Sequence, residues 1–158
     1  MNPYQIVANN GRFYLIANYD KYDNVAHFRI DRMTDVKMLS CKSKPMKQVK
    51  GLENGLNLPK HMAEHIYMFC GDSEIVKIKT TDDMMSELTD WFGSDFSVMK
   101  KDGNEIIARI KCNLNAMRYW ALQYGPYVEV LEPEILRKAL AKDTAYMAKK
   151  YNGTSSEE

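Results

Sequence analysis

The sequence predicts an α+β protein of two units, a small antiparallel β unit followed by a ferredoxin-like β-α-β-β-α-β unit with a C-terminal helix. Residues 1–52 contain short strand-like runs joined by tight turns, and no helical period occurs there. Strand and helix patterns alternate over residues 72–151, punctuated by Gly, Pro and Asn. Residues 53–71 are predicted to form a linker with one helix, and the polar residues 152–158 are expected to be a disordered tail.

The first unit is expected to be a small antiparallel barrel, complete or partial. Strand-like runs occur at residues 4–8, 12–19, 25–30 and 34–39. The first two flank Asn9-Asn10-Gly11, a strong hairpin signal because Asn and Gly tolerate the positive φ of a tight turn. In the second run, Arg12 and Tyr14 alternate with Phe13 and Leu15, and we expect the face of Phe13 and Leu15 to be the core face.

The linker and the second unit carry clear start and stop signals. Pro59 suits the first turn of a helix that is expected to run through Phe69 to a stop at Gly71. The second unit is predicted to contain strands at 74–80, 96–99, 105–112 and 127–131, and helices at 82–92, 115–124 and 133–147. Asp102-Gly103 is a turn signal between the second and third of these strands.

Composition excludes several classes of protein. With 45% hydrophobic and 27% charged residues, the chain of 158 residues is in the range of globular proteins. No apolar run approaches the roughly 20 residues that span a bilayer, and the first residues show no basic-then-apolar pattern that would predict a secretion signal. Cys41, Cys70 and Cys112 lie far apart, which favours reduced thiols and a cytoplasmic location. No phosphate-binding loop, dinucleotide motif or nucleophile elbow occurs, so no enzyme activity or cofactor is expected.

Charge is unevenly distributed along the chain. Residues 1–52 carry nine basic and four acidic residues, whereas 12 basic and 15 acidic residues follow from residue 72. A basic first unit suggests an anionic partner, and Arg and Tyr suit phosphate binding and base stacking. The candidate ligand-binding residues are Arg12, Tyr14, His27, Arg29 and Arg32. The alternative is a solvated surface on which Asp31 and Asp35 neutralise the two later arginines.

His61-Met62-Ala63-Glu64-His65 spells H-x-x-E-H, the signature of a class of zinc proteases. Histidines four residues apart share a helix face and can bind one metal, while the glutamate polarises a bound water. A third ligand would have to come from a second element, and no acid-rich or histidine-rich context supplies one. We therefore expect no metal site and keep a zinc hydrolase only as an alternative to a solvated linker helix.

Several segments resemble the WYL family of bacterial transcriptional regulators. Phe13-Tyr14-Leu15 is similar to the Trp-Tyr-Leu tripeptide of the WYL domain, and the stretch 27–33, His-Phe-Arg-Ile-Asp-Arg-Met, is similar to a second family motif. The stretches 120–125 and 128–133, with Leu136-Arg137, resemble the WCX domain that follows WYL domains. The resemblance covers nearly the whole chain in the right order.

The resemblance implies an SH3/Sm-like barrel followed by a ferredoxin-like domain, together acting as the ligand-sensing, dimer-forming part of a regulator. It places the ligand pocket at Tyr14, Arg29 and Arg32, with His27 adjacent, and implies a ligand such as single-stranded DNA, RNA or a small nucleotide. A homodimer is expected, formed through the WCX domain; a dimerisation module without a ligand remains the alternative.

The sequence departs from the family pattern in three ways. The helix-turn-helix and an early barrel strand have no counterpart, so an incomplete barrel and no operator reading by this chain alone are expected. Phe13 replaces the family's tryptophan and is expected to remain an aromatic core residue.

Overall fold

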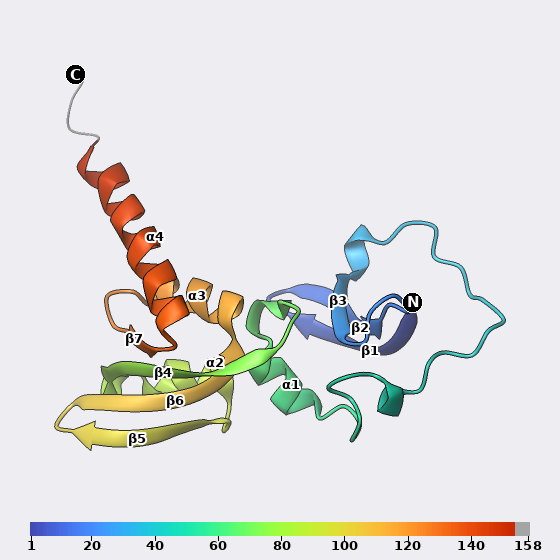
Figure 1. Ribbon diagram of the computed structural model, residues 1–158, viewed down its shortest axis with the longest axis horizontal. Coiled ribbons are helices and arrows are strands. Elements are labelled where there is room, and N and C mark those ends of the chain that lie inside the picture. The colour runs from blue at the N-terminus through green and yellow to red at the C-terminus, as the bar shows by residue number, and fades with distance from the viewer. Residues whose placement is uncertain (154–158) are drawn as a thin grey trace.

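The computed structural model describes residues 1–153, which form two separate antiparallel sheets (Figure 1). The first has three strands in the order β1-β2-β3, namely β1(Asn2–Asn9), β2(Arg12–Asn18) and β3(Val25–Arg29). Asn10 (φ 48°) and Gly11 (φ 72°) both have positive φ, as the predicted hairpin turn between β1 and β2 requires. The second strand therefore lies between two edge strands.

The predicted barrel is not closed within the described residues. The strand expected at residues 34–39 is absent, and residues 33–45 have no regular structure. Asp35 has a positive φ of 51°, which interrupts an extended chain, and Val36 and Met38 are 77% and 100% exposed. The first unit is consequently an open three-stranded sheet. Figure 1 shows the loop of residues 33–45 extending away from this sheet.

The linker helix is shorter than the sequence predicts. Helix α1(Leu58–Glu64) begins after Asn57, whose side chain accepts a hydrogen bond from the Lys60 N–H at 3.2 Å. It ends at Glu64 instead of continuing to Phe69, because Tyr67 (φ 59°) and Met68 (φ 57°) are both left-handed. Residues 65–70 thus form a bent junction between the two units.

The second unit shows the predicted β-α-β-β-α-β-α order. Its elements are β4(Ser73–Thr81), α2(Met85–Phe92), β5(Phe96–Asp102), β6(Glu105–Asn113), α3(Leu114–Gln123), β7(Glu129–Glu132) and α4(Glu134–Asn152). The sheet order is β5-β6-β4-β7, and β4 is antiparallel to both neighbours, so β6 and β7 run parallel on either side of it. The predicted tail lies outside the described residues apart from Asn152, which ends α4, and Gly153.

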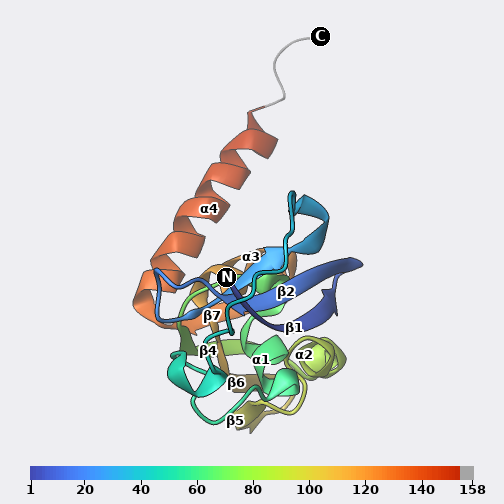
Figure 2. The same cartoon turned by 90° about the vertical axis from the view of Figure 1, so that its right-hand side faces the viewer.

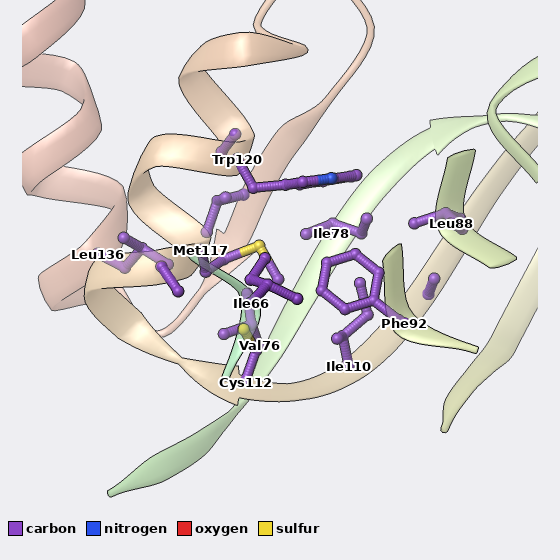
Figure 3. Packing of buried hydrophobic residues seen from close by; sticks show 14 of the residues in the cluster. Ile66, Val76, Ile78, Leu88, Phe92, Ile110, Cys112, Met117, Trp120 and Leu136 are labelled. Atoms are coloured by element: carbon purple, nitrogen blue, oxygen red, sulfur yellow. The ribbon is translucent and has the colours of Figure 1, made fainter. Parts of the chain in front are cut away.

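One face of this sheet carries the main hydrophobic core (Figure 3). Alternate residues of β4 and β6 point into it and pack against α2 and α3, with Trp120 and Phe92 fully buried side by side. Figures 1 and 2 show α4 leaving the sheet at its first turns and projecting away from both units. No helix within residues 1–153 is long and apolar enough to cross a membrane.

Asn113 joins the second unit to the junction. Its Oδ1 accepts from the N–H groups of Asn115 (3.0 Å) and Ala116 (3.2 Å), which caps α3, and its Nδ2 donates to the carbonyl of Cys70 at 3.1 Å. We expect Asn113→Ala to lower the free energy of unfolding by about 2 kcal/mol, since the cap of α3 and the part-buried hydrogen bond to the Cys70 carbonyl are lost together. Urea unfolding measures this. Asn113→Ser keeps a side-chain oxygen that can cap α3 and adds no charge at this buried site, so an equal loss in the serine and alanine variants would contradict the capping role.

Candidate functional site

Three of the predicted ligand-binding residues share one face of the small sheet. Tyr14 on β2 is the cross-strand partner of Arg29 on β3, and the next pair in register on that face is Ile16 with His27. Directly opposed residues of this kind have Cβ atoms about 5 Å apart, so the phenol and the guanidinium are neighbours. The register therefore brings Tyr14 and Arg29 together.

Arg29 is held by an acidic neighbour. Its Nε donates to Asp31 Oδ1 at 3.0 Å, and its Nη2 pairs with Asp31 Oδ2, so both donors of the planar fork are engaged. This hydrogen bonding raises the pKa of Arg29 and lowers the pKa of Asp31. The Arg29 side chain is 24% exposed, so the pair lies at the edge of the sheet and is accessible to solvent.

The other two arginines are exposed and are not hydrogen-bonded to a carboxylate as Arg29 is. Arg12 is exposed at the start of β2, and Arg32 is exposed in the 3₁₀ turn Ile30–Arg32 that follows β3. Neither side chain has an ion pair or hydrogen bond among the described residues. Arg32 nevertheless acts electrostatically on Asp31, the partner of Arg29, and its part in ligand binding stays a prediction.

The buried face of β2 is the reverse of the predicted one. Tyr14 is half-buried and packs with Ile16 against Val7 and Met68, whereas Phe13 is 63% exposed. Phe13 is thus not a core residue. Alternation assigns Tyr14 and Phe13 to opposite faces, but the packing of α1 and the junction on one of them decides which is covered.

His27 occupies a cluster that the sequence prediction missed. Its Nε2 lies 2.8 Å from His61 Nε2, and its ring centroid lies 5.2 Å from that of His65. The ring of His61 on α1 stacks on the ring of His65, the C-cap residue of α1, with 4.2 Å between the ring centroids. The H-x-x-E-H spacing signals the α1 pair, but nothing local in the sequence places His27 beside it.

This cluster does not have the arrangement of a zinc hydrolase. The rings of His61 and His65 are nearly parallel, 22° apart, so their nitrogens do not converge on one point. Glu64, the expected base, has its Oε1 3.0 Å from the Lys111 ammonium. Within residues 1–153 no three His, Cys, Asp or Glu side chains are grouped so as to hold a metal ion.

A cleft of about 830 Å³ lies between the units, beside the histidine cluster. His61, His65, Lys60 and Lys111 line it from the second unit and α1, and the loop 50–57 closes the other side. Tyr14 and Arg29 do not line this cleft, so the predicted ligand site and the cleft are separate features.

Comparisons with known proteins agree with this two-part organisation. The family model of the WYL domain matches residues 1–38, and that of the WCX domain matches residues 72–148. The chain carries a WYL domain followed by a WCX domain. WYL and WCX domains are regulatory domains found in transcriptional regulators and are generally non-catalytic. The histidine helix α1 and the junction lie between the two matched segments.

A solved structure shows the same fold. The crystal structure of a CRISPR Cas-related protein superposes with a TM-score of 0.57 and 16% identity, covering 98% of this chain and 43% of that one. The proteasome accessory factor B/C (PafBC) of Arthrobacter aurescens has a TM-score of 0.43 and 20% identity, covering 98% of this chain and 22% of that one. The WYL–WCX chain thus spans less than half the length of either protein. No curated protein matches its sequence.

Proposed function

We propose that this WYL–WCX chain is the ligand-sensing, dimer-forming part of a cytoplasmic transcriptional regulator, and that its small sheet binds a phosphate-bearing ligand. The ligand class is single-stranded nucleic acid or a small nucleotide. Arg29 binds the phosphate, Tyr14 stacks on the base or donates a hydrogen bond, and Arg12 and Arg32 add positive charge at the rim.

The Arg29–Asp31 pair is the observation that carries this proposal. An arginine fork that holds a carboxylate with two donors presents the geometry with which arginine binds phosphate. The acceptor is the chain's own Asp31, 57% exposed, which an incoming phosphate can displace. Tyr14 lies directly across the strand from the fork, where a base attached to that phosphate would lie.

Opposite effects of two substitutions test the site. We expect Arg29→Ala to weaken binding of a labelled single-stranded oligonucleotide about tenfold and to reduce the salt dependence, because one phosphate contact is lost. Asp31→Asn removes the competing carboxylate and should strengthen binding severalfold. Fluorescence anisotropy at two salt concentrations measures both. Lys149→Ala, which removes a positive charge on distant α4, is the matched control.

The proposal fails if the wild-type chain binds neither DNA, RNA nor mononucleotides, or if Arg29→Ala and Lys149→Ala weaken binding equally. Equal weakening would mean that only net charge attracts the oligonucleotide. An unchanged affinity in Asp31→Asn would show that Arg29 is not the phosphate-binding group.

A dimerisation module without a ligand is the second candidate, and α4 favours it. This helix projects from the second unit with Ile135 69% and Tyr146 62% exposed. Sedimentation velocity distinguishes the two functions. A tight dimer that binds no oligonucleotide or nucleotide would favour the dimerisation module alone.

A further inference from the structure

All three histidines of the chain meet at the contact between its two units. His27 comes from β3 of the small sheet, whereas His61 and His65 come from α1 and its C-terminal cap. The three rings contact one another pairwise, with centroids 4.2 to 5.2 Å apart. Since the chain has no other imidazole, any histidine titration reports this contact alone.

The hydrogen bonds around His27 define its protonation. Its Nδ1 lies 3.1 Å from the carbonyl oxygen of Met68, which can only accept, so Nδ1 carries the proton. Nε2 of a neutral His27 is then an acceptor, and His61 Nε2, 2.8 Å away, donates to it. A proton added to His27 Nε2 would set two N–H groups against each other and abolish this bond.

His65 makes the contact less tolerant of charge. Its Nδ1 donates to the His61 carbonyl at 2.9 Å, and its ring lies on that of His61. A positive charge on either α1 ring would therefore lie beside a second imidazole. Burial, reinforced by the neighbouring imidazoles, lowers the pKa of His27 to about 4 and that of His61 to about 3.

Within residues 1–153, no carboxylate makes an ion pair or hydrogen bond with the three histidines that would compensate for a charge. Glu64 on α1 is paired with Lys111 of β6, and Asp72 is paired with Lys50 of the loop. On the side of the junction, the Cys70 thiol accepts from the His27 backbone N–H at 3.2 Å and has its Sγ 3.6 Å from His27 Nδ1. The remaining charged groups of the adjoining cleft are Glu53 and Lys60.

His27 also holds a strained segment of the junction in place, residues Tyr67 and Met68. Tyr67 and Met68 are consecutive left-handed residues without a glycine, a conformation that costs on the order of 1 kcal/mol or more for each residue. The His27 ring holds the Met68 carbonyl, and the Met68 side chain is buried against Val7 and Ile16 of the small sheet. Loss of the His27 contact would allow this segment to relax and separate the units.

We infer that His27 and His61, packed against His65, form a proton-operated coupling between the WYL sheet and the WCX unit, closed while these two imidazoles are neutral and opened when they are protonated. The cluster is then a route by which acidification changes the relative position of the two units. It operates whether or not Arg29 binds an anion, because the cluster and the arginine fork share no contact.

The pH dependence of the contact between the units follows from the difference in histidine pKa between the open and closed states. In the open state the imidazoles of His27 and His61 meet water and regain a pKa near 6.5, whereas in the closed state they resist protonation. The closed contact is therefore fully favoured above pH 6.5, and its advantage falls as pH decreases from 6.5 toward 4. Each histidine that takes up a proton on opening favours the open state about 30-fold at pH 5.

Two measurements on the full chain test this inference. In an NMR titration of the imidazole Cε1–H resonances, we expect at least two of the three histidines to have midpoints below pH 5. In hydrogen exchange corrected for the intrinsic rate, protection of residues 65–70 should fall at least about 30-fold between pH 7.5 and pH 5. Residues 105–113 of β6 should keep their protection over this range.

The double variant His27→Gln/His61→Gln is the matched control, since glutamine keeps hydrogen-bonding capacity and does not titrate. We expect its junction exchange to be independent of pH between 7.5 and 5. The inference is wrong if all three wild-type histidines titrate near pH 6.5, or if the wild type and the variant lose protection equally. If the variant does not fold, the wild-type NMR titration decides alone.

Discussion

Replacing Trp120 by alanine is expected to lower the free energy of unfolding by about 3–5 kcal/mol, a typical cost for deleting a buried aromatic side chain. Trp120 is fully buried at the centre of the second unit's core, where Phe92 meets it edge-on with ring centroids 5.1 Å apart (Figure 3). Tyr124 packs against it at 5.0 Å. Alanine leaves a cavity between α2 and α3 that the sheet behind them cannot fill.

The conservative variant Trp120→Phe separates the contribution of ring packing from the cost of burying the indole N–H. The Trp120 Nε1–H is buried and has no hydrogen-bond partner among the described residues. Phenylalanine removes this unpaired donor, whose burial costs about 1–3 kcal/mol, and loses part of the packed area in exchange. We expect a net change within about 1.5 kcal/mol in urea unfolding followed by circular dichroism. A loss as large as that of Trp120→Ala would show that the ring shape dominates.

The sequence predicted the second unit well because its elements are bounded by local signals. Gly93 follows α2, Asn113 caps α3 and Pro133 precedes α4, and each of these residues has a conformational preference that acts without tertiary contacts. Helix α1 extended less far than predicted because its end depends on the left-handed Tyr67 and Met68. Neither residue favours that conformation on its own.

In the first unit the periodicity was correct and the assignment of faces was wrong. A period of two separates Tyr14 from Phe13, but the side that is covered depends on where α1 and Met68 pack, far along the chain. The strand register makes Tyr14 and Arg29 cross-strand neighbours, and their role in ligand binding stays a prediction. The histidine cluster could not be predicted, because His27 and His61 are 34 residues apart and no motif links them.

Asn18→Asp is expected to lower the free energy of unfolding by about 3–5 kcal/mol at pH 7, the cost of an uncompensated buried charge. Asn18 is fully buried at the end of β2, and its Nδ2 donates to the carbonyls of Tyr22 (2.8 Å) and Asn24 (2.9 Å). These two bonds hold the turn between β2 and β3. A carboxylate of the same shape would direct an oxygen at both carbonyls and have no proton to donate.

The pH dependence of this variant identifies the cause. The buried carboxyl introduced in place of the Asn18 amide would have a pKa above that of the unfolded chain, so the penalty is present at neutral pH and decreases as pH falls toward about 4, where a protonated carboxyl can again donate one bond. Asn115→Asp, the same change at an exposed residue in the first turn of α3, should shift stability by less than about 0.5 kcal/mol at either pH. A pH-independent loss in Asn18→Asp would mean that altered packing, and not the missing N–H donors, destabilises the sheet. Recovery at low pH would show that two hydrogen bonds from one amide fix the β2–β3 turn, and with it the register that places Tyr14 beside Arg29.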